Sequence, residues 1–207
     1  PETLTNIFPQ ILSQNGYRQL RIAETEKYAH VTYFMNGGEE KVFPNEKRIL
    51  VPSPRVKTYD LKPEMSALEV TDKVTEVIMN NDADAVILNY ANPDMVGHTG
   101  DLSAAITAIE AVDKCLGQVF QHINTQHWTM FLTADHGNLE LMIDPDSGDA
   151  HTAHTTFPVP FVMIESTGKY NLKTNGKLAD IAPTILSYLE LEIPDEMTGN
   201  NLLSHNT

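Results

Sequence analysis

Short apolar runs separated by helical patterns constrain the fold of this chain more than any other feature. The run Ala85-Val86-Ile87-Leu88 is apolar on both faces, which is typical of an interior strand in a parallel sheet. Residues 130–132 and 159–164 form similar runs. Because parallel strands need crossover connections, we expect helices to cover both faces of the sheet. The sequence therefore predicts an α/β fold with a mostly parallel sheet.

Two amphipathic helices are predicted from their start signals and apolar spacing. Ser66 and Glu69 form a Ser-x-x-Glu capping box ahead of apolar residues at helical spacing. Those residues are Val70, Val74, Val77 and Ile78. A longer helix is expected from Asp101, with apolar residues along one face. Those residues are Leu102, Ile106, Ile109, Val112, Leu116, Val119 and Ile123.

Prolines set the expectations for two further segments. The stretch 39–63 contains four prolines, which lack backbone donors and disfavour helix, so we expect an extended loop there. A last helix is predicted from about Ala179 to Glu190. Pro183 suits its first turn if the helix starts near Asp180.

The charge balance and the single cysteine exclude several classes of function. Fourteen basic and 28 acidic residues give a formal net charge of −14, which disfavours binding to a nucleic-acid backbone. No apolar run approaches the roughly 20 residues needed to cross a bilayer. Cys115 has no second cysteine to pair with, which is consistent with a reducing compartment. A phosphorylated ligand would have to be met by metal ions or by a few placed cations.

Three short segments are rich in metal-ligating side chains. The segments are 92–100, with Asp94 and His98; 133–138, with Asp135 and His136; and 151–155, with His151 and His154. The first two follow predicted strands, and in open α/β sheets ligands bind beyond the carboxyl ends of the strands. Carboxylate oxygens and imidazole nitrogens together suit divalent ions such as manganese or zinc.

Each segment alone also has a simpler explanation. Asp94 and His98 could belong to a turn, Asp135 could be a helix cap, and His151 and His154 could lie in a solvated loop. Four of the eight histidines fall within these three segments, so their joint occurrence favours metal binding. The glycines beside them (Gly97, Gly100 and Gly137) are expected to allow tight turns near the ions.

These motifs resemble those of a known enzyme family. The sequences Asp94-x-x-Gly-His98-Thr-Gly, Thr-Ala-Asp135-His136-Gly-Asn and His151-Thr-Ala-His154-Thr are similar to the metal motifs of cofactor-independent phosphoglycerate mutases. These mutases belong to the alkaline phosphatase superfamily. The segment 21–32, with Glu24-Thr25-Glu26-Lys27-Tyr28, and Asn36-Gly37-Gly38 also match the family pattern. The resemblance extends from about Gly16 to Leu203.

The resemblance implies a two-metal phosphoryl transferase that interconverts 3-phosphoglycerate and 2-phosphoglycerate without bisphosphoglycerate. By match of motif, Asp94, His98 and His154 would hold one manganese ion. Asp135 and His136 would supply part of the second site, and cobalt, magnesium or zinc could replace manganese. Lys27 matches a lysine that binds the phosphoryl group and acts in catalysis. The resemblance also implies a cytoplasmic, monomeric parent enzyme without a nucleic-acid or membrane partner.

The chain departs from the family in its N-terminal part. The family's nucleophilic serine, an aspartate ligand and an inserted substrate-binding domain have no counterpart before Leu20, and the serines present lie in other contexts. We therefore interpret residues 1–207 as the C-terminal part of the metal-binding phosphatase-like domain, with an incomplete sheet and no activity on its own. Unpaired strand edges and exposed apolar surface are expected where the sheet is incomplete.

Other interpretations stay open at this level. The parent could be another superfamily enzyme, such as a phosphopentomutase or a phosphatase, or a non-catalytic metal-binding domain. The Lys27 segment argues against the last of these, because the sequence offers no structural explanation for it. His30 is interpreted as a packed or exposed residue rather than a ligand, and His151 could support the metal ligands. Cys115 is expected to be a small core residue.

Overall fold

The computed structural model describes residues 4–206; residues 1–3 and 207 of the predicted range 1–207 lie outside the described part. The helices and strands of the first 126 residues include those next to Lys27, Asp94 and His98. They are α1 (Phe8–Gln14), β1 (Gln19–Glu24), α2 (Thr25–Val31), β2 (Glu46–Val51), α3 (Ala67–Met79), β3 (Ala85–Asn89), α4 (Asn92–Gly97) and α5 (Leu102–Gln126). The remaining elements are β4 (Met130–Thr133), β5 (Phe161–Ile164), β6 (Tyr170–Leu172), α6 (Ile181–Tyr188) and β7 (Leu203–His205), with short 3₁₀ helices at Tyr59–Leu61 and Leu178–Asp180.

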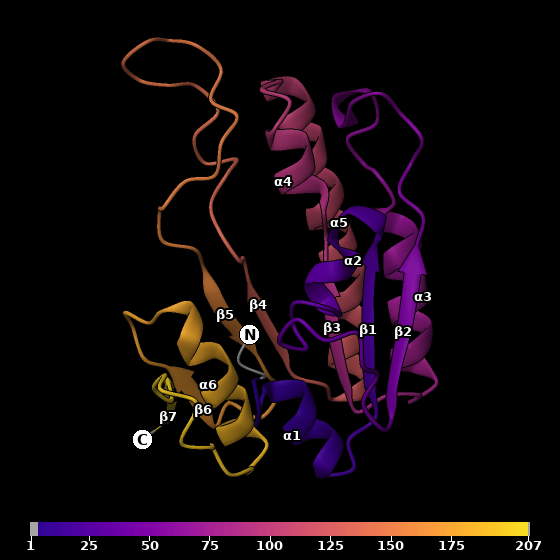
Figure 1. The fold of residues 1–207 in the computed structure, drawn as a ribbon, viewed down its shortest axis with the longest axis vertical. Helices are drawn as coiled ribbons and strands as arrows, with labels where there is room; N and C mark the ends of the chain where they lie inside the picture. The colour runs from indigo at the N-terminus through magenta and orange to yellow at the C-terminus, as the bar shows by residue number, and fades with distance from the viewer. Residues whose placement is uncertain (1–3, 207) are drawn as a thin grey trace.

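A parallel three-stranded sheet forms the centre of the fold, in the order β2-β1-β3. Leu20 and Ile22 on one face of β1 belong to the apolar core that α3 and α5 complete (Figure 1). On the opposite face, the Gln19 side chain donates a hydrogen bond to the carbonyl of Pro9 in α1. Helices therefore cover both faces, and the predicted α/β class is confirmed.

Strand β2 lies inside the segment that was expected to be an extended loop, so that expectation is wrong for Glu46–Val51. Pro44 and Pro52 bracket the strand, and no proline lies between them. Its backbone donors are therefore intact and can pair with β1. The prolines mark the ends of the strand rather than a continuous loop.

The two predicted long helices form, but the cap of α3 and the buried face of α5 differ from the prediction. The predicted capping box is wrong, because Ser66 makes no side-chain cap and instead donates its hydroxyl to the carbonyl of Pro52. Asp101 does cap α5 by accepting a hydrogen bond from the Ala104 backbone at 2.8 Å. In the second half of α5, Val119 and Ile123 reach the core as predicted.

The first half of α5 buries small residues instead of the predicted large ones. Leu102, Ile106 and Ile109 are exposed, which corrects the predicted face. The residues buried there are Ala104, Ala105 and Ala108. Two of these alanines pack in a cluster with Val96 of α4, where close helix contact leaves no room for larger side chains. The prediction counted large apolar residues and so selected the wrong face. Cys115, in contrast, is buried as expected.

The other strands form two antiparallel pairs, β4 with β5 and β6 with β7. Within the described residues, β3 and β4 each pair with one strand only. The side chains of β3 are half-buried, whereas all those of β1, which has a strand on each side, are buried. The last predicted helix appears as α6, with Pro183 in its first turn.

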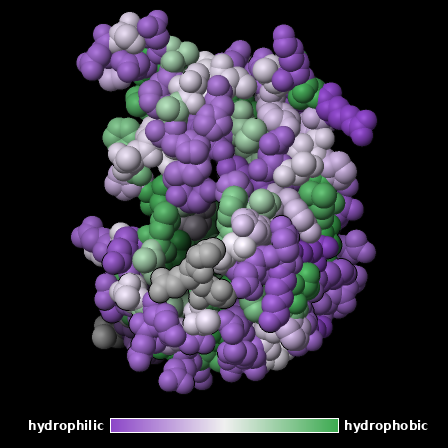
Figure 2. Space-filling model, viewed as in Figure 1, coloured by the Kyte–Doolittle hydropathy of each residue, from purple (hydrophilic) through white to green (hydrophobic). Residues whose placement is uncertain are grey.

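The hydropathy of the surface varies over the face drawn in Figure 2. Figure 2 shows one face that hydrophilic residues largely cover, with a hollow near its centre that has apolar residues at its edge. None of the helices described is both long and apolar enough to cross a membrane.

Candidate metal centre

The candidate site lies beyond the carboxyl ends of the parallel strands. Lys27 comes from the first turn of α2, which directly follows β1. Asp94 lies on α4, shortly after β3, and His98 is the C-cap residue of the same helix. His136 follows β4, and His154 precedes β5 on the long loop at the upper left of Figure 1. Four separate parts of the chain therefore meet at one end of the sheet, as the strand positions predict.

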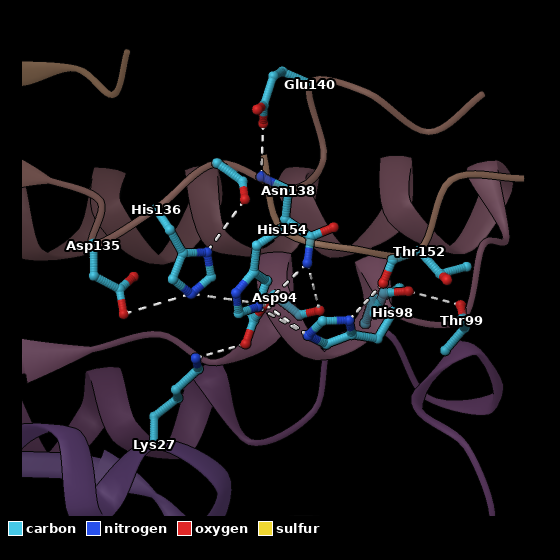
Figure 3. Close-up of polar contacts among 12 residues, drawn as sticks. Lys27, Asp94, His98, Thr99, Asp135, His136, Asn138, Glu140, Thr152 and His154 are labelled. Atoms are coloured by element: carbon cyan, nitrogen blue, oxygen red, sulfur yellow. Dashed lines mark hydrogen bonds and ion pairs between the residues drawn. The ribbon is translucent and has the colours of Figure 1, made fainter. Parts of the chain in front are cut away.

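The carboxylate of Asp94 is the centre of this group of side chains (Figure 3). Its Oδ1 lies 3.0 Å from His98 Nε2 and 2.8 Å from His154 Nε2, and the two imidazole nitrogens are 3.1 Å apart. Asp94 and His98 are four residues apart on a helix, so they share one face. The ligand atoms of these three residues all lie within 4.8 Å of one another, and together they could hold a metal ion.

The chemistry of the donors favours a cation at this point. His98 Nδ1 lies 2.7 Å from the carbonyl oxygen of Thr152, which can only accept a hydrogen bond. A neutral His98 therefore carries its proton on Nδ1 and directs the Nε2 lone pair toward Asp94 and His154. Lone pairs that converge in this way repel one another unless a proton or a metal ion lies between them. The backbone hydrogen bond is the support that metal-bound histidines usually have.

Asp135 and His136 lie beside this group rather than within it. His136 Nε2 is 3.9 Å from Asp94 Oδ1 and 3.7 Å from Asp135 Oδ2. The His136 ring also stacks on that of His154, with 3.7 Å between the ring centroids. The structure therefore brings all of the ligands predicted from the sequence into one neighbourhood, with Asp135 and His136 at one side (Figure 3).

Lys27 forms a buried ion pair with the central carboxylate. Its Nζ lies 2.6 Å from Asp94 Oδ2, and its side chain is only 4% exposed. Burial raises the pKa of Asp94, but hydrogen bonds from Lys27 and Asn138 outweigh that effect and hold the pKa well below its usual range. Asp94 therefore stays ionised at neutral pH without a metal ion.

The residues before Lys27 have structural roles that were not apparent from the sequence. The buried carboxylate of Glu24 accepts hydrogen bonds from the Ser53 hydroxyl and the Ser66 backbone. Glu26 accepts one from the Tyr59 hydroxyl at 2.6 Å. These contacts fasten the segment to the chain after β2, which supplies the structural explanation that the sequence alone lacked. The ion pair of Lys27, in contrast, is with Asp94, a residue of the candidate site.

His30 lies one turn after Lys27 on α2 and is partly buried. Burial and the charge of Lys27 lower its pKa, and the charges of Asp135 and Asp94 act in the opposite direction. The site therefore influences His30 electrostatically, although His30 makes no hydrogen bond to a predicted ligand within the described residues. Its interpretation as a packed residue stays a prediction, as does a supporting role for His151.

Sequence reasoning assigned no role to Asn138, Glu140 or Thr155. Asn138 Nδ2 donates to Asp94 Oδ1 at 2.9 Å, and Glu140 accepts a hydrogen bond from the Asn138 backbone at 2.8 Å. The Thr155 hydroxyl donates to the same Glu140 carboxylate. Asn138 and Thr155 stand within the predicted motifs, so their positions next to ligands were the only available signal.

Only one of the three glycines beside the ligands has the left-handed backbone conformation that favours glycine. Gly100 has a φ of +74°, but Gly97 and Gly137 are not among the residues with positive φ. A Cβ atom at Gly97 would collide with the Asn138 side chain, and one at Gly137 would collide with Glu140 and Thr155. At these two positions glycine provides space for neighbouring side chains rather than a turn.

Comparison with known proteins assigns the class. A model of the metalloenzyme superfamily matches residues 1–193, so the chain belongs to this superfamily. Among its relatives are two bacterial 2,3-bisphosphoglycerate-independent phosphoglycerate mutases. The Clostridium beijerinckii protein is 56% identical over 203 residues, and the Acetivibrio thermocellus protein is 58% identical over 203 residues. Each alignment covers 98% of this chain, and the predicted resemblance to this enzyme family is confirmed.

A solved structure agrees with the sequence comparison. The chain superposes on Leishmania mexicana phosphoglycerate mutase, solved at low cobalt concentration, with a TM-score of 0.92 and 31% identity. The match covers 100% of this chain and 40% of the Leishmania one. The chain likewise spans 40% and 39% of the length of the two bacterial relatives.

Proposed function

We propose that this chain provides the Lys27 and metal-binding part of the active site of a cofactor-independent phosphoglycerate mutase. The reaction would interconvert 3-phosphoglycerate and 2-phosphoglycerate through a phosphoserine. The observation that carries the proposal is the arrangement around Asp94. One of its oxygens faces two imidazole nitrogens and the other is bound to a buried lysine, in a chain 56% identical to such a mutase.

Asp94, His98 and His154 would hold one divalent cation, and Asp135 and His136 would contribute to a second. Manganese is the expected ion, and cobalt, magnesium and zinc are alternatives, because carboxylate and imidazole ligands accept several metals. Two bound cations would offset the negative charge of a transferring phosphoryl group. This would let a chain with a net charge of −14 act on a phosphorylated acid.

Lys27, which contacts the Asp94 oxygen that faces away from the two histidines, would also bind the phosphoryl oxygens. An ammonium group has three donors, and its hydrogen bond to Asp94 uses one of them. The same hydrogen bond fixes the direction of the lysine side chain, so the remaining donors have a defined position. Lys27 would thus stabilise the phosphoryl group as it approaches and leaves the nucleophile.

The 207-residue chain is expected to bind metal but not to turn over substrate. The resemblance places the nucleophilic serine and an aspartate ligand of the second metal in a segment for which this sequence has no match. The second metal should therefore bind more weakly than the first. An isolated chain that catalyses the reaction would contradict this part of the proposal.

A chimera tests the proposed function directly. This chain would replace the matching 40% of the Clostridium beijerinckii mutase, and the conversion of 3-phosphoglycerate to 2-phosphoglycerate would be measured with Mn²⁺. We expect an active mutase, and a matched chimera with Asp94→Asn should be inactive. A folded chimera that binds Mn²⁺ but only hydrolyses phosphate esters would contradict a mutase and favour a phosphatase.

A further inference from the structure

Asn138 connects the loop after β4 to the central carboxylate of α4. Its Nδ2 donates to Asp94 Oδ1 at 2.9 Å and approaches the Asp94 carbonyl oxygen at 3.3 Å. The Asn138 side chain is 4% exposed, and its Oδ1 is buried without a hydrogen-bond partner among the described residues. A buried side-chain amide whose oxygen has no hydrogen-bond partner lowers the stability of the fold. This cost indicates that the hydrogen bond from its Nδ2 to Asp94 has a specific role.

The hydrogen bonds of Asp94 show what that task is. Lys27 binds Oδ2 at 2.6 Å, and Asn138 binds Oδ1, the oxygen that faces His98 and His154. A hydrogen bond to one oxygen alone leaves an aspartate carboxylate more freedom to turn about its Cβ–Cγ bond. Two hydrogen bonds, one to each oxygen, fix the plane of the carboxylate and therefore the direction of the remaining lone pairs on Oδ1.

Glu140 in turn joins Asn138 to the segment of His154. Figure 3 shows the first of these two contacts, between Glu140 and the Asn138 backbone. One carboxylate oxygen accepts from the Asn138 backbone at 2.8 Å, and the other accepts from the Thr155 hydroxyl. The Thr155 backbone also donates to the carbonyl of Gly137 at 3.0 Å. The position of Asn138 is thereby tied to the residue next to His154, so one carboxylate relates two parts of the site.

Glycine at two motif positions makes this arrangement possible. The Asn138 side chain occupies the space where a Cβ atom at Gly97 would lie. The side chains of Glu140 and Thr155 occupy the space where a Cβ atom at Gly137 would lie. Neither glycine is required by a positive φ. The absence of these two side chains is therefore explained by the Asn138 and Glu140 contacts.

We propose that Asn138, held in place by Glu140, is a positioning residue that directs the Asp94 carboxylate toward the two histidines and so prepares the cation site. The inference rests on the proposed metal-binding function and assigns a role to residues that do not themselves bind the ion. Removing such a supporting residue typically costs 10- to 100-fold in metal affinity.

Co²⁺ binding to the 207-residue chain tests this role, because the Co²⁺ absorption spectrum reports ligand geometry as well as affinity. We expect Asn138→Ala to weaken Co²⁺ binding about 10- to 100-fold and to change the spectrum at saturation. Asn36→Ala is the matched control, since Asn36 is 2% exposed and donates to the Lys41 carbonyl, apart from the site. It should lower stability but leave the Co²⁺ affinity and spectrum unchanged.

A second pair of variants keeps the test valid if Asn138→Ala fails to fold. Glu140 is exposed, so Glu140→Ala removes its hydrogen bonds without opening a cavity in the core. We expect it to weaken Co²⁺ binding several-fold. In Glu140→Gln the amide oxygen can still accept from the Asn138 backbone, and the amide nitrogen can donate to the Thr155 hydroxyl, so this variant should bind nearly as well as the wild type.

Gly97→Ala tests the position of the Asn138 side chain independently, because Gly97 lies against it. Its new methyl group should displace the Asn138 side chain and weaken Co²⁺ binding as Asn138→Ala does. Adding Gly97→Ala to Asn138→Ala should then have little further effect, because the side chain it displaces is already gone. Additive losses of affinity would overturn the proposed contact.

The outcomes separate the two proposals. A wild-type chain that binds no Co²⁺ would overturn the proposed function, and this inference with it. Wild-type binding that is unchanged in both Asn138→Ala and Glu140→Ala would overturn this inference alone. An equal loss of affinity in Asn36→Ala would also overturn it, since general destabilisation would then explain the result.

Discussion

The two halves of the candidate metal centre are held in place by different means. Asp94 and His98 are four residues apart at the end of α4, where the His98 backbone donates to the Asp94 carbonyl at 3.1 Å. His136 and His154 lie on the loop between β4 and β5, which is joined by two isolated bridges, Gly137 with Thr155 and Ile143 with Ala150. Helical geometry thus sets one pair of ligands, and contacts within a single long loop set the other.

This difference indicates where the site can fail. The separation of Asp94 and His98 follows from the helix itself, so distant substitutions should change it little. The position of His154 depends on a few contacts within the loop, among them the Thr155 hydroxyl with Glu140 and the Thr155 backbone with Gly137. We therefore expect substitutions on α4 to remove ligands outright and substitutions in the loop to loosen a site that can still bind.

The largest effect is expected at the carboxylate that both halves share. Asp94→Asn keeps the size of the side chain but removes the charge and one of the two acceptor oxygens. Mn²⁺ affinity should fall by more than the roughly 100-fold upper figure for loss of a supporting residue. Isothermal titration of the 207-residue chain with Mn²⁺ measures this, and affinity within 10-fold of the wild type would show that Asp94 is not a ligand.

The second largest effect is expected at the buried ion pair. Lys27→Met removes the cation that pairs with Asp94, whose side chain is only 13% exposed, and breaking a buried pair typically costs about 3–5 kcal/mol. We expect a loss of about 3 kcal/mol in the free energy of unfolding, since Asn138 still donates to Asp94. Urea unfolding without metal measures it.

Added metal should reverse part of this loss. A cation bound at Asp94 replaces the missing positive charge, and it stabilises the folded state more strongly as its affinity and concentration rise. Mn²⁺ should therefore stabilise Lys27→Met more than it stabilises the control Lys27→Arg, which keeps the charge. Equal stabilisation of the two variants would contradict a shared electrostatic role for Lys27 and the cation.

The helical half of the site was more predictable from the sequence than the loop half. The spacing of Asp94 and His98 places both on one helix face, and the end of β3 directs them toward the site. The approach of His154 depends on how the loop between β4 and β5 folds back, which no local pattern specifies. For this reason Glu140, outside every predicted motif, was missed although it holds the loop.

The same distinction explains the errors in the fold. The strand at β3 and the start of α5 at Asp101 are local signals, and both appear in the structure, although β3 is half-buried. The Ser66 cap was displaced by a tertiary contact with Pro52, and β2 forms because β1 lies beside it. Local patterns predicted elements correctly where no distant partner competed for the same hydrogen-bonding groups.

A pH titration should separate the loop contact from the rest of the molecule. Partial burial raises the pKa of Glu140, but hydrogen bonds from Thr155 and the backbone outweigh it and lower the pKa below its usual value. A carboxylate with a lowered pKa adds stability above its unfolded-state pKa of about 4.3, and this is lost as the pH falls through the folded-state value.

Wild-type stability should therefore fall more steeply than that of Glu140→Gln as the pH decreases from about 5 to 3. Asp94 is present in both proteins, so its own titration cancels in the comparison. Urea unfolding at a series of pH values measures the difference between the two proteins. A difference that stays constant across this range would show that the Glu140 contacts do not stabilise the loop.

The smallest effect is expected at the opposite end of the sheet. Arg18 and Asp84 form an ion pair at 2.6 Å just before β1 and β3, but their side chains are 45% and 36% exposed. Water screens exposed pairs, so the loss in free energy of unfolding caused by Asp84→Ala should be several-fold smaller than the loss caused by Lys27→Met. Mn²⁺ affinity should not change, because the pair lies at the amino ends of the strands. A loss of stability as large as that of Lys27→Met would show that burial is not what distinguishes the ion pair in the metal centre.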